Sequence, residues 1–362
     1  MLAGLISGAL LLAACSSGGG SGAPPVQEAT FHNLGFLPGY ASSRATAVSS
    51  DGSVIAGTAT SSAGNRQAFR WDARQGVVGL GFLPGGSASA ATAVSANGAV
   101  IVGTADANNA DLSTPSAGVR WTADADPQRL DPLPGSYLCA AAGVSGDGAT
   151  VVGTCLQNNN TAFRWTSSSG AVALGRFGGG SNQQSTASAI SLDSAVIVGA
   201  GHPVLTGAVI WAADGRPTIL GKLPGDATGT ATAVSSDGSV IVGSSLDAAG
   251  NSRAFRWTQQ TGMVDLGNAP AGLLGSAATS ISGDGRVIVG WGPTATGDAA
   301  LVWDADHGLR LLDAALATDY QTQIPGWKLT RAAAISVDAL TIAGYGPNPQ
   351  GQTEAWIVKL PN

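Results

Sequence analysis

The sequence predicts an all-β fold, a seven-bladed β-propeller with four antiparallel strands in each blade. Three short markers each recur seven times along the 362 residues, at intervals of about 45 residues, a period typical of propeller repeats. Each repeat contains four short strand-like runs. The last repeat lacks its fourth run, and a matching run stands near the start of the chain. Together these observations favour a closed ring of repeats.

The repeat is clearest in two nearly identical segments, LGFLPGYASSRATAVSSDGSVIAGTA at 34–59 and LGFLPGGSASAATAVSANGAVIVGTA at 80–105. A leucine that opens a Leu-Gly pair or a close relative recurs at Leu34, Leu80, Leu130, Leu174, Leu220, Leu266 and Leu311. The glycine of the VIVG run recurs at Gly57, Gly103, Gly153, Gly199, Gly243, Gly290 and Gly344. The serine of the AVS segment recurs at Ser49, Ser95, Ser145, Ser191, Ser235, Ser282 and Ser336.

In the first repeat the predicted strands are residues 45–49, 54–58, 68–71 and 77–81. The runs are rich in β-branched residues, are shorter than helices and have no helical period, so we expect strands throughout. The VIVG run is apolar at every position, as expected of a strand packed on both faces. A solenoid is the alternative, but it would need polar capping repeats, and neither end of the sequence resembles one.

The two ends of the sequence predict how the ring closes. The seventh repeat stops at residues 354–360, its third strand, and residues 31–35 read as an unpaired fourth strand. We therefore expect the N-terminal strand to complete the seventh blade. Closure of this kind leaves no exposed sheet edge at the junction.

The N-terminal segment predicts export and lipid attachment. Residues 1–14 are apolar and too short to span a bilayer as a helix, and they fit an export signal. Leu12-Ala13-Ala14-Cys15 resembles a bacterial lipobox, so we expect lipidation of Cys15. Residues 15–28 read as a flexible tether and 29–362 as the propeller. Ser16 resembles the pattern of lipoproteins sent to the outer membrane, and the lipid would be the only membrane attachment.

Two further cysteines lie in the third repeat, at equal distances from a predicted hairpin turn. Cys139 and Cys155 each stand eight residues from Asp147. Export places the chain in an oxidising compartment, where disulfides form. We predict a Cys139–Cys155 disulfide across the hairpin; the alternative is two reduced, buried cysteines.

The order LGxLPGG, ATAVSxDGSVIVG, AFRW and GxVxLG resembles the HAF repeat of bacterial extracellular proteins. The resemblance covers nearly all of residues 31–360, and its best copies are the first, second and fifth repeats. The name-giving histidine is replaced by Gln67, Thr161 or Arg253. The resemblance implies export and a propeller-like fold, and it implies no established chemistry.

Residues that recur in nearly every repeat are interpreted as structural. A tryptophan ends the third strand at Trp71, Trp121, Trp165, Trp211, Trp257 and Trp303. We expect these rings to pack between blades, with Trp356 of the seventh repeat shifted to the phenylalanine position and Val358 in the tryptophan position. An acidic residue or asparagine marks the first hairpin turn at Asp51, Asn97, Asp147, Asp193, Asp237, Asp284 and Asp338. Asp-Gly and Asn-Gly pairs are typical of tight turns.

Composition and motifs exclude several functions. A net charge of −6 without any basic run argues against nucleic-acid binding. The histidines His32, His202 and His307 are scattered over different repeats without metal-ligand spacing. No nucleophile elbow, phosphate loop or zinc-protease motif is present. We therefore expect no catalytic residues, no metal and no cofactor.

One departure from the repeat suggests a binding site. The aromatic residues outside the repeat pattern fall in or beside the long, variable loops, where binding residues commonly lie. Five of them come from repeats six, seven and one, which closure makes neighbours: Tyr40, Trp291, Tyr320, Trp327 and Tyr345. Such a patch suits a sugar or an extended peptide. The alternative is that these residues only pack the long loops.

We therefore expect a monomeric, envelope-anchored and non-enzymatic binding module for a glycan or an envelope protein. One alternative is a propeller enzyme acting on a polysaccharide, which would need paired carboxylates, with Asp226, Asp298 and Asp319 as candidates. Glutamate is nearly absent, with only Glu28 and Glu354. The other alternative is a structural scaffold for envelope proteins.

Overall fold

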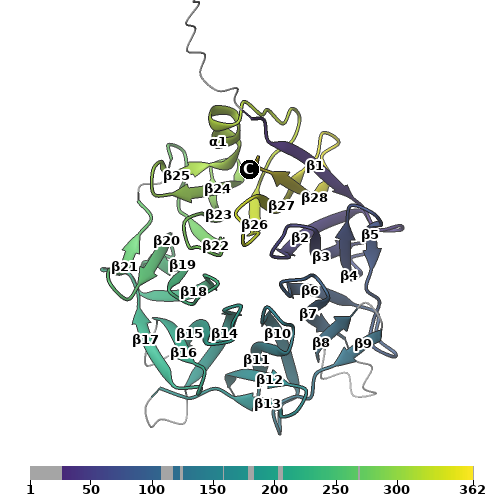
Figure 1. Cartoon of the computed structure of the whole chain (residues 1–362), viewed down its shortest axis with the longest axis vertical. Helices are drawn as coiled ribbons and strands as arrows, with labels where there is room; N and C mark the ends of the chain where they lie inside the picture. The colour runs from purple at the N-terminus through teal and green to yellow at the C-terminus, as the bar shows by residue number, and fades with distance from the viewer. Residues whose placement is uncertain are drawn as a thin grey trace, which may run out of the picture.

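The computed structural model describes residues 27–106, 117–122, 125–157, 159–177, 183–202, 207–267 and 270–361. Across these residues the strands form seven four-stranded antiparallel sheets arranged as blades around a central axis (Figure 1). The predicted signal peptide at 1–14, the lipidation site Cys15 and most of the tether lie outside the described residues. No helix in the described part of the chain is long and apolar enough to cross a membrane.

The strands follow the repeat in order, each blade running from its innermost to its outermost strand. Blades 1 and 2 contain β2 (Ser42–Val48), β3 (Val54–Thr60), β4 (Arg66–Asp72), β5 (Gly76–Gly79), β6 (Ser89–Val94), β7 (Val100–Ala105), β8 (Ala117–Thr122) and β9 (Ala125–Arg129). Blades 3 and 4 contain β10 (Leu138–Val144), β11 (Thr150–Leu156), β12 (Asn160–Thr166), β13 (Gly170–Ala173), β14 (Gln184–Ile190), β15 (Val196–His202), β16 (Gly207–Ala212) and β17 (Pro217–Gly221).

Blades 5 and 6 contain β18 (Thr228–Val234), β19 (Val240–Leu246), β20 (Ser252–Thr258), β21 (Gly262–Asp265), β22 (Ala277–Ile281), β23 (Ile288–Thr294), β24 (Gly297–Asp304) and β25 (Gly308–Leu311). Blade 7 contains β26 (Arg331–Ile335), β27 (Thr341–Pro347), β28 (Thr353–Lys359) and, as its outermost strand, β1 (Thr30–Gly35). The predicted seven-bladed propeller is therefore confirmed, including the N-terminal strand that completes the last blade.

The closure of blade 7 is secured by a buried carboxylate. Glu354 in β28 is 3% exposed. One of its oxygens accepts hydrogen bonds from the Asn33 side chain at 2.8 Å and from the Gly35 backbone at 2.9 Å, both in β1. Its other oxygen accepts one from the Asn348 amide at 2.8 Å. A single side chain thus joins the two ends of the chain.

The VIVG glycine of each repeat is required by a bulge in the strand beside it. The innermost strand of every blade changes register after the alanine that pairs with this glycine, as between Ala45, the partner of Gly57, and Ala47. At Gly103, a Cβ atom would lie much closer to the carbonyl oxygen of Ala90 than two non-bonded atoms can approach. The other six glycines of this set meet the equivalent carbonyl, so no larger residue fits.

The blades are also joined by a chain of backbone hydrogen bonds between their first hairpin turns. Ser50 donates to Ala96 at 3.0 Å, Ala96 donates to Gly146, and Gly146 donates to Leu192. From blade 5 onward Ser236 donates to Gly283, Gly283 to Val337, and Val337 back to Ser50 at 3.1 Å. Within each turn the repeated serine donates to the aspartate or asparagine two residues later, as Ser49 does to Asp51 at 2.7 Å. The structural interpretation of these turns is confirmed.

The core lies between the blades, where the repeated aromatic residues pack. Trp121, Trp165 and Trp211 are at most 3% exposed and belong to clusters shared by neighbouring blades. Trp71, Trp257 and Trp303 are half-buried against similar clusters. In blade 7, Trp356 pairs with Gly344 and Val358 with Ile342, as Phe69 pairs with Gly57 and Trp71 with Ile55 in blade 1. The predicted exchange of positions is confirmed.

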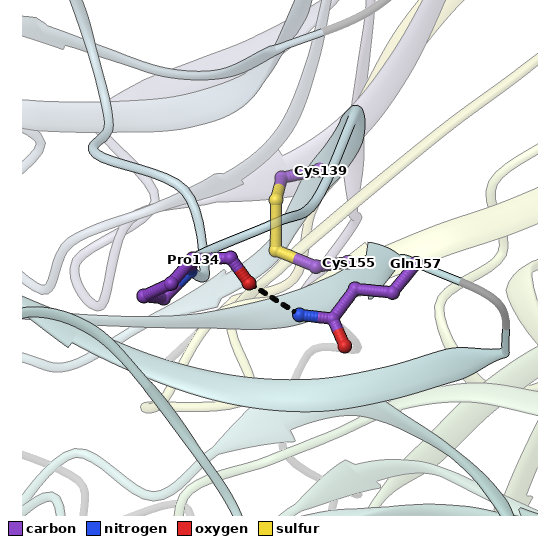
Figure 2. The surroundings of a disulfide bond; sticks show 4 residues. All are labelled: Pro134, Cys139, Cys155 and Gln157. Atoms are coloured by element: carbon purple, nitrogen blue, oxygen red, sulfur yellow. Dashed lines mark hydrogen bonds between the residues drawn. A yellow bond between two sulfur atoms is a disulfide. The ribbon is translucent and has the colours of Figure 1, made fainter.

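The predicted disulfide is present in blade 3 (Figure 2). Cys139 in β10 and Cys155 in β11 are direct cross-strand partners with their Cα atoms 4.0 Å apart. Directly after β11, the Gln157 side chain donates to the carbonyl of Pro134 at 2.7 Å and so ties the end of the hairpin to the segment that leads into β10 (Figure 2). Blades 1, 2 and 4 have serine at the Cys139 position, namely Ser43, Ser89 and Ser185. Those hydroxyls accept a hydrogen bond from the preceding blade.

The segment between β25 and β26 contains a helix, where the sequence predicts only strands and loops. Helix α1 (Leu312–Asp319) follows β25 directly and packs beside blade 6 at the outer rim (Figure 1). It buries Leu312, Ala315 and Leu316. Eight residues give little more than two turns, which is too short for a helical period to stand out in the sequence.

Candidate functional site

Three adjacent blades depart from the repeat at one position of their two inner strands. We call this position one level of the ring: in each blade it is the pair of strand partners equivalent to Arg44 and Thr58 in blade 1. The innermost-strand residue at this level is small in five blades, namely Ala90, Ala140, Thr186, Thr230 and Ala277, but it is Arg44 in blade 1 and Arg331 in blade 7. Its partner on the second strand is also small in five blades, namely Thr58, Thr104, Thr154, Ala200 and Ser244. That partner is Trp291 in blade 6 and Tyr345 in blade 7. The four large residues therefore share one level in blades 6, 7 and 1.

These four side chains form a row in which aromatic rings and guanidinium groups alternate. The Arg331 guanidinium lies 3.6 Å from the ring centre of Trp291 across the boundary of blades 6 and 7. Arg331 is the direct strand partner of Tyr345. Arg44 of blade 1 lies over the Tyr345 ring at 5.2 Å. Both distances are within the range of a cation–π interaction, so each ring positions one arginine.

Arg331 is also held by a carboxylate. Its Nε and Nη2 atoms donate to the same oxygen of Asp298 in β24, at 2.9 and 2.7 Å. Both side chains of this ion pair are about one-third exposed, at 34% and 30%. The ring on one side and the carboxylate on the other fix the guanidinium and cancel its charge.

A cavity of about 340 Å³ opens at this row. It is lined by Arg44, Asp298, Thr330, Arg331, Tyr345, Pro347 and Thr353. We call these seven residues together with Trp291 the Arg331 site. Arg44 is exposed, and in the described part of the chain it forms no ion pair. The site therefore presents one uncompensated positive charge beside polar side chains.

The structure distributes the five predicted aromatic residues over different places. Trp291 and Tyr345 are part of the Arg331 site. Tyr40 is half-buried in the core between blades 7 and 1, and its hydroxyl donates to Gln67 at 2.8 Å. Trp327 packs edge-on against Phe31 at a ring distance of 5.0 Å and lines a different cavity beside α1. The single aromatic patch therefore reduces to two of its members.

Tyr320, the fifth, lines a larger cavity of about 710 Å³ beside blade 6. We call this the blade 6 cavity; its walls include the β24–β25 turn and helix α1. Three of its charged groups pair with one another, because Arg310 binds Asp304 at 3.1 Å and Asp319 at 2.8 Å. Arg256, also in the lining, forms no ion pair with a described residue. Burial and the neighbouring Asp319 raise the pKa of the Tyr320 hydroxyl above its ordinary value, so Tyr320 stays protonated at neutral pH.

The carboxylates that a polysaccharide-cleaving enzyme would need lie in separate ion pairs. Asp226 pairs with Arg253 at 2.7 Å, Asp298 pairs with Arg331, and Asp319 pairs with Arg310. Each belongs to a different set of residues and has its own arginine. Within the described ranges, no group of three histidine, cysteine, aspartate or glutamate side chains could hold a metal ion.

Sequence reasoning selected the aromatic members of this site and missed Arg44 and Arg331. The signal for them is present in the sequence. The residue before the repeated Ala-Thr-Ala segment or its equivalent is alanine or threonine in five repeats and arginine only in the first and seventh. Both arginines stand directly before the predicted first strand of their repeat, and they were passed over because only aromatic residues outside the repeat pattern were selected.

Comparison with known proteins identifies the fold and no more. No protein-family model matches the chain, and no curated protein matches it. Among solved structures, an oligogalacturonate lyase in complex with manganese is similar at 12% identity, with a TM-score of 0.58 over 92% of this chain and 97% of that one. The β-propeller domain of the trilobed protease from Pyrococcus furiosus is similar at 8% identity, with a TM-score of 0.57 over 88% and 95%.

TolB from Acinetobacter baumannii matches at 14% identity with a TM-score of 0.49, over 72% of this chain and 64% of that one. At these identities the likeness concerns architecture alone. The lyase and the protease propeller domain support a propeller-like architecture, and the seven blades follow from the sheets of this chain itself.

Proposed function

We propose that the chain is an exported, lipid-anchored binding module of a bacterial envelope, that it acts without catalysis, and that it binds a glycan or a protein at the Arg331 site. The observation that carries the proposal is the break in the repeat. At one level of the ring, ten of the fourteen residues on the two inner strands are small, and the four large ones lie in three adjacent blades. The fold does not require them, because the other blades pack without them.

Two further observations support this function. The arginines of the site are held by rings and by a carboxylate before any ligand arrives, and preorganised groups lose less entropy on binding. The three candidate catalytic carboxylates are each neutralised by a separate arginine, which favours binding over hydrolysis.

The proposed location rests on the N-terminal sequence and on the disulfide. The Cys139–Cys155 bond is the kind of crosslink found in secreted proteins. The lipobox-like Leu12–Cys15 segment and the resemblance to HAF repeats support export and attachment to the outer membrane through Cys15. Palmitate labelling of the expressed chain, compared with a Cys15→Ser variant, tests the attachment. Equal labelling of both proteins contradicts it.

The binding function is tested with residues 16–362, which contain every strand of the ring. The protein is passed over immobilised envelope glycans, extracellular glycans, peptidoglycan and envelope proteins. A Trp291→Ala, Arg331→Ala double variant is compared with Thr230→Ala, which changes the same level of the ring in blade 5. We expect saturable binding that only the double variant loses. Equal binding by all three proteins, or no binding by the folded parent, would overturn the proposal.

A further inference from the structure

We propose that the ligand of the Arg331 site is a carboxylated polysaccharide, and that the guanidinium of Arg44 binds its carboxylate. This inference rests on the proposed binding function and names the class of ligand. It follows from three properties of the site: which charge is free, which ring faces are covered, and which polar groups surround the cavity.

The free charge is on Arg44. Arg331 forms two hydrogen bonds to Asp298, so its charge is already compensated. Arg44 is exposed, lines the cavity and forms no ion pair with a described residue. A guanidinium binds a carboxylate through two parallel hydrogen bonds, a geometry that lysine cannot match. An anionic ligand group therefore completes the pairing that the protein leaves open at Arg44.

The aromatic rings serve the arginines and do not offer a clear stacking platform. The Arg331 guanidinium stands 3.6 Å from the centre of the Trp291 ring and covers that face. Arg44 lies over the Tyr345 ring at 5.2 Å. A neutral sugar that binds mainly by stacking would have to displace these cations. Recognition by charge needs no such displacement.

The rest of the lining favours a ligand rich in hydroxyl groups. Thr330 and Thr353 line the cavity beside the Tyr345 phenol. Thr330 donates to the Tyr345 carbonyl at 2.9 Å, which leaves its oxygen able to accept. The apolar part of the lining comes mainly from Pro347 and the tyrosine ring, whereas peptide side chains are commonly recognised in apolar pockets. An acidic sugar matches this combination better than an acidic peptide.

The test uses pairs of probes that differ in one property. Residues 16–362 are titrated with polygalacturonate, with the same polymer after methyl esterification, with dextran and with polyglutamate. Esterification removes the charge and keeps the sugar backbone. The variants are Arg44→Ala, Arg44→Lys and Arg74→Ala, where Arg74 is an exposed arginine on the β4–β5 turn of the same blade. The Arg74→Ala variant also loses one positive charge, but at a residue that does not line the cavity.

We expect saturable binding of polygalacturonate that weakens about tenfold or more with Arg44→Ala and on esterification. Arg44→Lys recovers only part of the loss because it cannot form the paired hydrogen bonds. Arg74→Ala stays within about twofold of the parent. Because Arg44 is exposed, its variants keep the fold, which circular dichroism verifies.

Other outcomes would overturn the inference. Equal or tighter binding of polyglutamate would assign the site to acidic peptides. Equal binding of the esterified polymer or of dextran would show that the carboxylate is not recognised. If the carboxylated polymer fails to bind while another ligand binds through Trp291 and Arg331, the inference falls and the proposed binding function stands. If nothing binds at this site, both fall.

Discussion

The closure of the ring is predicted to depend on the buried carboxylate of Glu354. Its two oxygens accept three hydrogen bonds, two from β1 and one from Asn348. Replacement of Glu354 by alanine removes all three acceptors. Asn33 is exposed, so its amide can bind water instead. The Gly35 N–H is half-buried and Asn348 is only 6% exposed, so these two donors are less accessible to water and would be left without an acceptor.

The expected loss can be worked out from these two donors. A buried donor left without an acceptor costs about 1–3 kcal/mol, so Glu354→Ala should lower the free energy of unfolding by about 2–6 kcal/mol. Asn348 cannot rotate its amide to compensate, because its oxygen accepts from the backbones of Gln350 and Gln352 at 3.0 and 2.9 Å. Glu354→Gln should lose about half as much, because its own NH₂ group faces at least one donor.

Two measurements check this prediction. Urea unfolding, followed by tryptophan fluorescence, gives the global effect. Hydrogen exchange of the β1 amides gives the local effect, and a loss of 2 kcal/mol accelerates exchange about 30-fold. The matched control is Glu28→Ala, which removes the other glutamate of the chain at an exposed position and should change stability by less than about 0.5 kcal/mol.

The reasoning is refuted if Glu354→Ala unfolds at the parent's urea concentration and its β1 amides exchange within twofold of the parent's rate. That result would mean that backbone pairing of β1 with β28 alone closes the ring.

Three further predictions concern the repeat itself. Replacement of Cys139 and Cys155 by alanine should lower the free energy of unfolding by about 3 kcal/mol, from the entropy of a crosslink spanning 16 residues. In urea unfolding, a Cys139→Ser, Cys155→Ala variant should recover about 1 kcal/mol of this loss, because serine at the Cys139 position binds the preceding blade in blades 1, 2 and 4. Gly103→Ala should destabilise by about 1–3 kcal/mol, since the new methyl group meets the Ala90 carbonyl, whereas Gly118→Ala should be tolerated in the same thermal melt, because blades 1, 3 and 4 have Ala68, Ala162 and Ala208 there. Hydrogen bonds from Ser145 and the Ala149 backbone, and likewise from Ser191 and the Ala195 backbone, hold the pKa of Asp147 and of Asp193 below the ordinary value. These carboxylates therefore stabilise the fold above the unfolded pKa of about 3.9 and lose that contribution as pH falls below it. Asp147→Asn and Asp193→Asn should flatten the acid limb of a plot of stability against pH without changing the turn, because Asn97 forms the same bonds in blade 2; an unchanged acid limb would contradict this.

The fold could be predicted from the sequence because each structural requirement recurs in six or all seven repeats. The VIVG glycine, the turn aspartate and the strand-ending tryptophan are each required by one local contact. Their recurrence at a fixed period distinguishes them from residues that occur there by chance. The disulfide was predictable for the same reason, because the hairpin that contains it is one copy of a known unit. Helix α1 was not predictable, since it occurs in a single repeat and is too short for a period to stand out.

The site could be predicted only in part. The aromatic residues drew attention as departures from the repeat, but a departure does not say where a side chain lies. Trp291 and Tyr345 meet because they occupy the same register level in neighbouring blades. Trp327 and Tyr320 belong to an insertion whose path depends on α1, so the pattern gave no guide to their position. Asp298 was noted as a carboxylate, and its role as the partner of Arg331 needed the three-dimensional structure.

The central claim is that the ligand binds at the Arg331 site, over blades 6, 7 and 1, and it is tested most directly by hydrogen exchange with and without the ligand selected from the immobilised panel. We predict protection in peptides covering residues 42–46, 289–300 and 329–347, with no change around α1. Protection confined to residues 304–320 would place the ligand in the blade 6 cavity and would contradict the account.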